Sequence, residues 1–307
     1  MIHLFIINPA AGKYDRTAEI REQVAKAAAE RNLDCRIEIS RKPGECKTIA
    51  RKAAETGGEI RIYACGGDGT LNEVVNGVAG FPNVAVTHFA GGSGNDFVRS
   101  FGAIEPFQNL NELLDSEEAQ FDLIRCNDDY ALNVCSVGFD ARIGTQIAAY
   151  KHLPLVSGPM SYVLSAAVNT IRGITEHYVV KCNGETVDGK QTMICVCNGS
   201  YYGGGFHPIP ESDPCDGMLD MLLVGPVSRL MVLQVIGKYK NGRYKELSNL
   251  ARYIQTRELT ILCDHETSVN LDGELRMSKE IHICLNGQKI RFFYPKSLHW
   301  HPGCKKD

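Results

Sequence analysis

The stretch Tyr63–Gly77, "YACGGDGTLNEVVNG", decides the fold, because it combines a strand end, a glycine loop and a helix start. Its three glycines form a loop that a ligand can approach closely, and the residues from Thr70 onward predict a helix. A glycine loop that leads into a helix N-terminus is a ready phosphate site. Asp68 puts a negative charge into this loop. That charge fits a nucleotide site if a divalent cation lies between the carboxylate and the phosphates, or if the carboxylate holds a lysine or a ligand hydroxyl.

Outward from this stretch, the first third of the chain alternates between strand and helix patterns. "IHLFIINP", "CRIEIS" and "NVAVTHFA" predict strands, and Thr17–Arg31 and "GECKTIARKAAETG" predict helices. Repeated strand–helix units favour a parallel sheet with helices on its faces. Ligands of such sheets bind at the carboxyl ends of the strands. The sequence therefore predicts that "GGDGT" and a second glycine stretch, "GGSGNDF" at Gly91–Phe97, line one crevice.

After about Asp122 the pattern changes to short β-rich runs separated by turn residues, which predicts a mostly antiparallel β-sandwich. Two stretches within it have helical spacing, Pro159–Arg172 and Ser228–Tyr239. We expect an α/β nucleotide-binding domain at residues 1–125 and a β-sandwich domain at residues 126–295. The remaining residues, 296–307, form a C-terminal tail that could pack back on the first domain.

Composition narrows the class of protein. The formal net charge of −3 in 307 residues lacks the clear excess of Lys and Arg that is typical of nucleic-acid-binding domains. We found neither a signal peptide nor an apolar window long enough for a membrane span. The 12 cysteines contain no C-x-x-C pair, and several lie in apolar runs such as "MICVCN". They are typical of reduced core residues in a cytoplasmic protein.

A third loop, Asn8–Lys13 ("NPAAGK"), follows the first predicted strand. It is not a P-loop, because Tyr14 stands where Ser or Thr would bind the metal. Its small residues would still let a phosphate approach, with Lys13 as counter-charge. The alternative is an ordinary turn with a solvated lysine. The corresponding alternative for "GGDGT" is a tight turn with Asp68 as helix N-cap, which does not account for three glycines.

Together, "NPAAGK", "GGDGTLNEVVNG", "GGSGNDFVRS" and the distant "NLDGE" resemble, in order and spacing, the diacylglycerol kinase catalytic family, which includes sphingosine kinases and bacterial soluble lipid kinases. "GGDGT" also occurs in NAD kinases and phosphofructokinases, so the "GND" and "LDGE" segments are what favour a lipid kinase. The resemblance implies an N-terminal α/β domain of the NAD kinase and phosphofructokinase type, a C-terminal β-sandwich, and catalysis between them.

The resemblance also implies which residues bind ATP. Members usually carry Thr near positions 40 and 93, and Ser40 and Ser93 keep the hydroxyl. The implied nucleotide-binding residues are Asn8, Pro9, Ala10, Ala11, Gly12, Lys13, Ser40, Arg41, Gly66, Gly67, Asp68, Gly69, Thr70, Leu71, Asn72, Glu73, Ser93, Gly94 and Asn95.

The catalytic residues are expected to be Asp272, Glu274 and Asp68. A carboxylate near the acceptor hydroxyl can take its proton. Asp272 and Glu274 are two apart, so on a strand they would face one side, and either could be the base. The alternative is a plain β-turn at Asp272-Gly273.

Two magnesium sites are also implied by the resemblance. The first uses the side chain of Asp216 and backbone oxygens of Asp213 and Met218. Asp96 and Asp122, in a charge network with Lys13, are candidates for a second, catalytic metal.

These residues predict an ATP- and Mg²⁺-dependent lipid kinase that transfers the γ-phosphate to a lipid hydroxyl, with diacylglycerol as first candidate and phosphatidic acid as product. The alternatives are NAD kinase-like phosphorylation of a soluble acceptor and a catalytically inactive nucleotide sensor. A lipid substrate predicts a cytoplasmic protein in peripheral contact with the inner membrane face, through Leu153–Val168 or through Leu230–Lys245 with its basic end at residues 238–245. A homodimer is compatible with the sequence.

Overall fold

The computed structural model describes residues 1–142 and 174–301. By its internal packing the chain forms two compact units. Among the described residues, unit 1 contains 1–123, 214–216 and 287–301, and unit 2 contains 124–142, 174–213 and 217–286. The units are therefore not two consecutive blocks of sequence, since the end of the chain belongs to unit 1.

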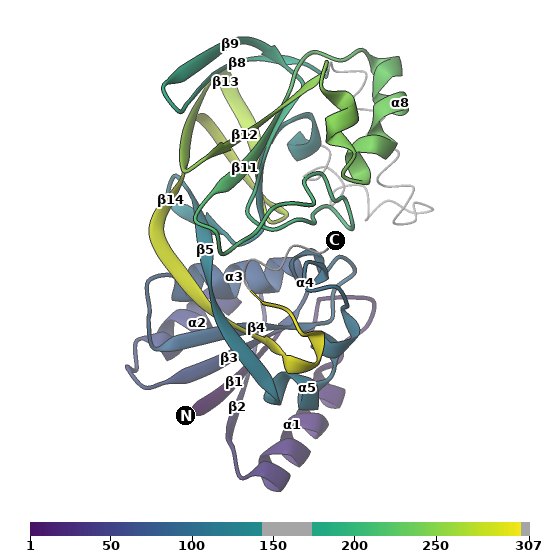
Figure 1. Ribbon diagram of the computed structural model, residues 1–307. Helices are drawn as coiled ribbons and strands as arrows, with labels where there is room; N and C mark the ends of the chain where they lie inside the picture. Colours follow the sequence, from purple (N-terminus) through teal and green to yellow (C-terminus); the bar gives the residue numbers. More distant parts are fainter. Residues whose placement is uncertain (143–173, 302–307) are drawn as a thin grey trace. The chain divides into compact units, whose positions relative to one another are not determined.

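Unit 1 is built on a parallel sheet in the order β2-β1-β3-β4-β14 (Figure 1). Strand β5 pairs with β14, and both of these strands contain residues of the two units. The elements that begin in unit 1 are β1 (Ile2–Ile7), α1 (Thr17–Arg31), β2 (Asp34–Ile39), α2 (Glu45–Ala54), β3 (Ile60–Gly66), α3 (Asp68–Val78), β4 (Val84–Ala90), α4 (Asp96–Arg99), η1 (Glu105–Gln108), α5 (Leu110–Leu114), β5 (Ser116–Cys126) and η3 (Lys296–Leu298).

The sequence explains why these elements form. Strands β1, β3 and β4 are continuous apolar runs that are buried almost throughout, as central parallel strands are. Helix α1 buries Ile20, Val24 and Ala27, which recur at helical spacing on one face.

An aromatic cluster joins residues 97–121 to residues 292–300 within unit 1. Trp300 lies with its ring centroid 4.8 Å from that of Phe101 and 5.2 Å from that of Phe121. The Phe292 ring lies 5.2 Å from the Phe97 ring. Aromatic pairs at these distances stabilise a core beyond the area that they bury. Trp300, near the end of the described residues, is thus part of the core of unit 1.

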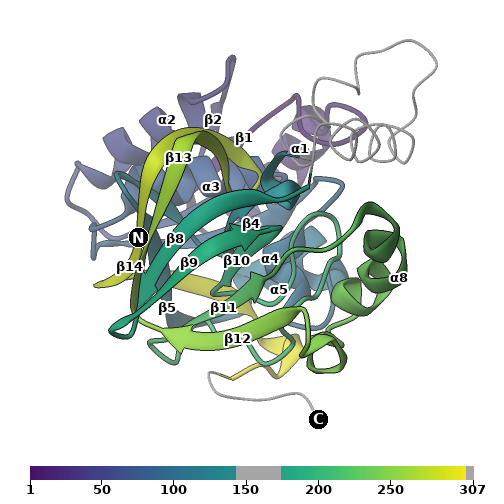
Figure 2. The ribbon, with the colours of Figure 1, turned by 90° about the horizontal axis from the view of Figure 1, so that it is seen from above.

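Unit 2 is an antiparallel, sandwich-like unit. Its path of paired strands is β12-β11-β10-β7-β13-β14, while β8 joins β13 to β9, and β6 pairs with the end of β5. Figure 2 shows β10, β11 and β12 side by side. The remaining elements are β6 (Asp129–Ala131), β7 (Val134–Gly138), β8 (Glu176–Cys182), β9 (Glu185–Gln191), β10 (Met193–Cys197), β11 (Leu219–Val224), α8 (Arg229–Lys240), η2 (Tyr244–Leu247), β12 (Ala251–Thr256), β13 (Glu258–Leu271) and β14 (Glu274–Pro295).

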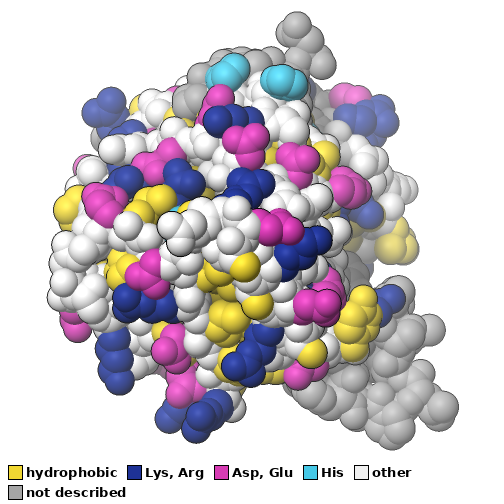
Figure 3. All heavy atoms as spheres, turned by 90° about the horizontal axis from the view of Figure 1, so that it is seen from below, with side chains coloured by type: hydrophobic (Ala, Val, Ile, Leu, Met, Phe, Trp, Pro, Cys, Tyr) yellow, Lys and Arg dark blue, Asp and Glu magenta, His cyan; other side chains and the backbone are white. Residues whose placement is uncertain are grey.

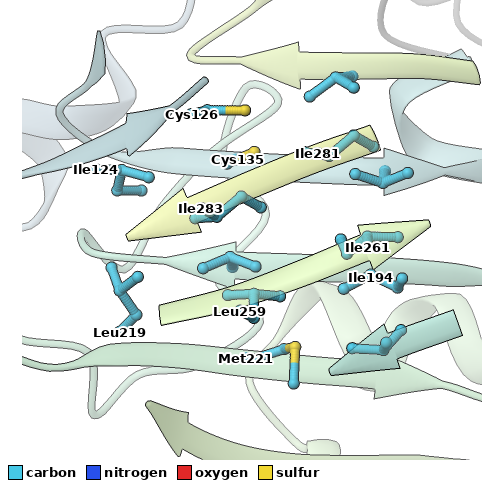
Figure 4. Packing of buried hydrophobic residues seen from close by; sticks show 14 of the residues in the cluster. Ile124, Cys126, Cys135, Ile194, Leu219, Met221, Leu259, Ile261, Ile281 and Ile283 are labelled. Carbon is cyan, nitrogen blue, oxygen red and sulfur yellow. The ribbon is translucent and has the colours of Figure 1, made fainter. Parts of the chain in front are cut away.

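Side chains of unit 2 alternate between two hydrophobic clusters. In β10, Ile194 and Val196 join the larger cluster, and Cys195 and Cys197 join the smaller one. Figure 4 shows Ile261 in the larger cluster, together with residues of β10, β11 and β14. All the described cysteines are free thiols, and most are buried. The buried cysteines therefore serve as small core residues, as the sequence predicted.

The fold class predicted from the sequence is confirmed, and so is the helix at Thr17–Arg31. Two of the short β-rich runs after Asp122, "RELTILC" and "TSVNLDG", form the single strand β13, which is irregular between Leu262 and Thr267. The polar strand β9 was not predicted. The predicted helix at Pro159–Arg172 and the apolar stretch Leu153–Val168 lie outside the described residues. Within the described chain, none of the helices has the length and apolarity that a membrane crossing requires.

Charged side chains of both signs are interspersed on the face of the molecule shown in Figure 3. This mixture fits the small formal net charge of −3.

Candidate active site

Three loops of unit 1 meet at the carboxyl ends of adjacent parallel strands. We call residues 8–13, 66–73 and 91–96 the three-loop corner. The Asn8 side-chain amide donates a hydrogen bond to the Thr70 hydroxyl at 3.0 Å. The Gly91 backbone N–H donates to the Gly66 carbonyl at 2.7 Å. The predicted convergence of the glycine stretches is therefore present in the structure.

The glycines let these loops approach backbone to backbone. A Cβ atom on Gly92 would lie 2.5 Å from the Gly67 Cα, and a Cβ atom on Gly94 would lie 2.5 Å from Asp68 Oδ2. Neither contact is possible for a larger residue without movement of the neighbouring loop. The same packing leaves bare backbone at the strand ends, which is the kind of surface that phosphates approach.

Asp68 connects the second loop to the third. Its Oδ1 accepts the Asp96 N–H at 2.7 Å, and its Oδ2 accepts the Asn95 N–H at 2.8 Å. Gly67, not Asp68, is the N-cap of α3. Burial raises the pKa of Asp68, whereas the two backbone hydrogen bonds and the Arg99 charge act to lower it. The carboxylate inside the glycine loop therefore holds the neighbouring glycine loop in place.

Glu73 makes a similar connection to the segment that follows β2. Its two carboxylate oxygens accept the N–H groups of Gly44 at 2.8 Å and Cys46 at 3.0 Å. Ser40 begins this segment and donates its N–H to the Ile7 carbonyl at 2.9 Å, next to the first loop. Arg41 is exposed. The structure thus places the predicted nucleotide-binding residues at 40 and 41 at the same sheet edge as the corner.

The other predicted nucleotide-binding residues of unit 1 differ in burial. Lys13 and Ser93 are exposed, whereas Thr70 and Asn72 are buried. The Leu71 side chain is part of the hydrophobic core, so only its backbone could face a ligand.

Asp272 lies in unit 2, at the turn between β13 and β14. Leu271 pairs with Glu274 across a two-residue turn, and both turn residues have positive φ, 51° at Asp272 and 96° at Gly273. Asp272 and Glu274 therefore do not share a strand, and the expectation that they face one side as strand neighbours was wrong. The turn separates them because an Asp-Gly pair readily adopts this geometry.

The Asp272 carboxylate accepts three backbone N–H groups. Oδ2 accepts from Leu132 at 2.7 Å, and Oδ1 accepts from Asn133 at 3.1 Å and from Val134 at 2.8 Å. Its conformation is thereby fixed relative to the start of β7. Glu274 is half-buried at the first position of β14.

The predicted metal ligands have varied surroundings. Asp96 pairs with Arg99 at 3.5 Å, and Asp122 pairs with Lys289 at 2.9 Å, so each carboxylate has a cation other than Lys13. The Asp122 N–H also donates to the Pro214 carbonyl at 2.7 Å, beside the half-buried Asp213. Asp216 is exposed and Met218 is half-buried.

Within residues 1–142 and 174–301, no three His, Cys, Asp or Glu side chains form a metal-binding group. A cation would therefore need backbone, water or phosphate oxygens as well as carboxylates. Mg²⁺ is normally bound in that way.

Two features of the described chain were not predicted from the sequence. The Arg99 side chain donates to the Gly94 carbonyl at 3.0 Å and so supports the third loop; its spacing of three from Asp96 was the available signal. In unit 2, burial raises the pKa of Asp140 to about 6, and the Tyr202 hydroxyl donates to its carboxylate at 3.0 Å. No sequence pattern indicated that the pKa of Asp140 would be raised.

Comparisons with known proteins agree with this architecture. Residues 3–126 match the family model of the diacylglycerol kinase catalytic domain. Residues 133–290 match the model of the YegS C-terminal NAD kinase beta sandwich-like domain. A Staphylococcus carnosus protein named "Putative lipid kinase" is 27% identical over 268 residues, which cover 81% of this chain and 87% of that protein. A Staphylococcus epidermidis protein of the same name is 25% identical over 267 residues, covering 85% of this chain and 86% of that protein.

Solved structures share the fold. A crystal structure titled as a putative diacylglycerol kinase from Bacillus anthracis covers 96% of this chain and 97% of its own, with a TM-score of 0.72 and 22% identity. A second structure, titled as a diacylglycerol kinase from the same organism, gives a TM-score of 0.68 at 20% identity. At these identities the likeness supports the arrangement of the chain and not its substrate.

Proposed function

The chain belongs to the kinase family defined by the diacylglycerol kinase catalytic domain and the YegS-type C-terminal domain, and we propose that it is an ATP- and Mg²⁺-dependent lipid kinase acting on diacylglycerol. The observation that carries the proposal is the three-loop corner. Its glycines present bare backbone at three strand ends, and Asp68 fixes two of the loops relative to each other. The names of the relatives support a lipid as acceptor.

On the nucleotide side, the residues position the phosphates and neutralise their charge, which is most of what kinase catalysis requires. Loops 66–70 and 91–94 would surround the phosphates with backbone N–H groups, and Lys13 would supply positive charge. Asp68 and Asp96 both lie beside Gly94, since a Cβ there would be 2.5 Å from Asp68 Oδ2 and 3.4 Å from Asp96 Oδ2. Two carboxylates next to phosphate oxygens fit Mg²⁺. Bound Mg²⁺ would neutralise charge on the transferred phosphoryl group.

On the acceptor side, the oxygen of the lipid hydroxyl forms a bond to the γ-phosphorus, and the bond between that phosphorus and ADP breaks. A carboxylate takes the proton that the hydroxyl loses in this step. We assign the removal of this proton to one of two carboxylates, Asp272 or Glu274. The Asp272 carboxylate accepts three backbone N–H groups, which fix its position, whereas Glu274 is the first residue of β14. Glu274→Gln and Asp272→Asn separate their roles, because the base variant loses kcat across the whole pH range while the other keeps a measurable pH profile.

The proposal is tested by transfer of radiolabelled γ-phosphate from ATP with Mg²⁺. Mixed micelles would offer diacylglycerol, sphingosine and monoacylglycerol, and free NAD would be present in the aqueous phase. We expect label in phosphatidic acid, and loss of label with Asp68→Ala, which removes the acceptor for two loop N–H groups. Label in NADP would show the NAD kinase-like alternative. Tight ATP binding by calorimetry without transfer to any acceptor would favour the nucleotide-sensing alternative.

A lipid acceptor also requires contact with a membrane surface, and we assign that contact to α8. Leu230 and Leu233 are 76% and 75% exposed, and Ile236 is 38% exposed. Spacing by three residues places these side chains along one region of the helix. Lys238 and Arg243 pair with Glu246, and Lys245 pairs with Glu211, so the apolar side chains carry this proposal more than the basic ones.

Sedimentation with vesicles that contain phosphatidylglycerol tests this surface. We expect the double variant Leu230→Gln/Leu233→Gln to bind at least about tenfold more weakly, because each buried leucine contributes about 1.5–3 kcal/mol. The matched control is Met277→Gln, which changes an exposed apolar side chain on β14. Equal sedimentation of the double variant and the wild type would overturn the role of α8.

A further inference from the structure

Glu73 lies in α3 and caps a different helix. Its Oε1 accepts the N–H of Gly44 at 2.8 Å, and its Oε2 accepts the N–H of Cys46 at 3.0 Å. Both donors lie at the start of α2, where the first N–H groups have no partner within the helix. Gly44 is the N-cap of α2 and has no side chain to satisfy them. The carboxylate of Glu73 therefore caps the N-terminus of α2, although Glu73 belongs to another helix.

The segment capped in this way is held at both of its ends. At its start, the Ser40 N–H and hydroxyl both donate to the Ile7 carbonyl, at 2.9 Å and 3.3 Å. In the middle, the Arg41 N–H donates to the Glu45 carboxylate at 2.5 Å. At its end, Glu73 holds Gly44 and Cys46. The turn Arg41–Gly44 is thus tied to β1 on one side and to α3 on the other.

This turn lies at the same edge of the sheet as the three-loop corner. Strand β2 is parallel to β1, and its last residue, Ile39, pairs with Ile7. The turn follows β2 directly, just as the first loop of the corner follows β1. Its position relative to the corner therefore depends on the two anchors, Ser40 and Glu73. Glu73, the second anchor, lies in α3, and α3 begins at Asp68 inside the glycine loop. The position of Glu73 therefore depends on the position of that loop.

We propose that Glu73 is a positioning residue, which sets the affinity for the nucleotide by holding the turn Arg41–Gly44 beside the corner. The inference rests on the proposed function, because it assigns the turn to the nucleotide site. It changes the role that the sequence suggested, which was direct contact with the ligand. Both oxygens of Glu73 instead accept protein N–H groups, so its effect on the ligand passes through the turn.

Glu73→Gln is the sharpest variant, because it keeps the size of the side chain. Its NH₂ group must face one of the two N–H donors, so one hydrogen bond is lost and that end of the turn is released. A hydrogen bond to a charged group is stronger than one between neutral groups, so we expect its loss to raise the KM for ATP about tenfold. The kcat should stay within about twofold, because the turn is not at the reacting atoms. Glu73→Asp retains the charge and should lie between the wild type and Glu73→Gln.

A matched control comes from the C-terminal end of α2, the helix whose N-terminus Glu73 caps. Glu55 follows the last turn of α2 and pairs with the exposed Arg51 at 3.2 Å. Glu55→Gln removes the same charge from the same region without touching the turn. It should leave the KM for ATP unchanged.

Two measurements keep this inference separate from the proposed function. Hydrogen exchange of residues 40–46 without nucleotide reports the capping bonds, and we expect it to be about tenfold faster in Glu73→Gln than in the wild type. Calorimetry with ATP reports the affinity without requiring turnover. Unchanged exchange in Glu73→Gln, or faster exchange with unchanged ATP affinity, would overturn the inference. Wild-type protein that binds no ATP would overturn the proposed function, while the exchange experiment would still decide whether Glu73 holds the turn.

Discussion

The three-loop corner of unit 1 and the sandwich of unit 2 are ordered by different forces. In the corner, carboxylates reach across loops to backbone N–H groups, as Asp68 and Glu73 do. In the sandwich, buried apolar side chains such as Ile261 and Ile281 pack against each other. Directional hydrogen bonds fix a loop while leaving its backbone open to a ligand, whereas apolar packing gives stability but exposes no chemistry. Substitutions in the two regions should therefore separate activity from stability.

The largest effect is expected from truncation in the sandwich. Ile261 is fully buried, and Ile261→Ala should lower the free energy of unfolding by about 2–5 kcal/mol, because the cavity is only partly refilled. The KM for ATP at low temperature should be unchanged. Urea unfolding and steady-state kinetics measure the two quantities. A KM that rises in step with the loss of stability would break the comparison.

The converse experiment belongs to the corner. A Cβ on Gly94 would lie 2.5 Å from Asp68 Oδ2, so Gly94→Ala must displace the carboxylate that holds Asn95 and Asp96. We expect kcat/KM for ATP to fall by about tenfold to a hundredfold, equivalent to about 1.4–2.7 kcal/mol, and the free energy of unfolding to change by less. Gly58→Ala is the control, since nothing lies within 4 Å of a Cβ there. A large loss of stability with little loss of activity would contradict the prediction.

A smaller effect concerns Asp140, a half-buried carboxyl group that follows β7 in unit 2. Burial raises the pKa of Asp140 from 3.8 to about 6, so the fold favours its protonated form. Asp140 therefore lowers the free energy of unfolding as the pH rises from about 4 through about 6, and it has no such effect below about pH 4. Asp140→Asn removes the charge and should make the protein more stable than the wild type by about 1–3 kcal/mol at pH 8, but not at low pH. Urea unfolding at pH 4 and pH 8 measures this difference, and a gap independent of pH would refute it.

The sequence predicted the periodic and local parts of the molecule well. Buried strands, the amphipathic spacing of α1 and the glycine loops at strand ends all depend on residues close together in the chain. The roles of single carboxylates were not predictable in this way. Asp68, Glu73 and Asp272 accept N–H groups of segments far away in sequence, and such pairs leave no spacing to detect. The sequence suggested roles for these three side chains at the ligand or in catalysis, and the structure adds that each of them holds the backbone of another segment.

The aromatic cluster of unit 1 has a consequence for the order in which the protein can be completed during translation. Phe97, Phe101 and Phe121 are synthesised before unit 2, whereas Phe292 and Trp300 are synthesised after it. The pairing of β14 with β4 waits for the same segment. The first unit to be synthesised is thus finished only after the second has emerged. A chain released before Phe292 is made therefore contains every glycine loop but lacks Phe292 and Trp300, which pack against Phe97, Phe101 and Phe121.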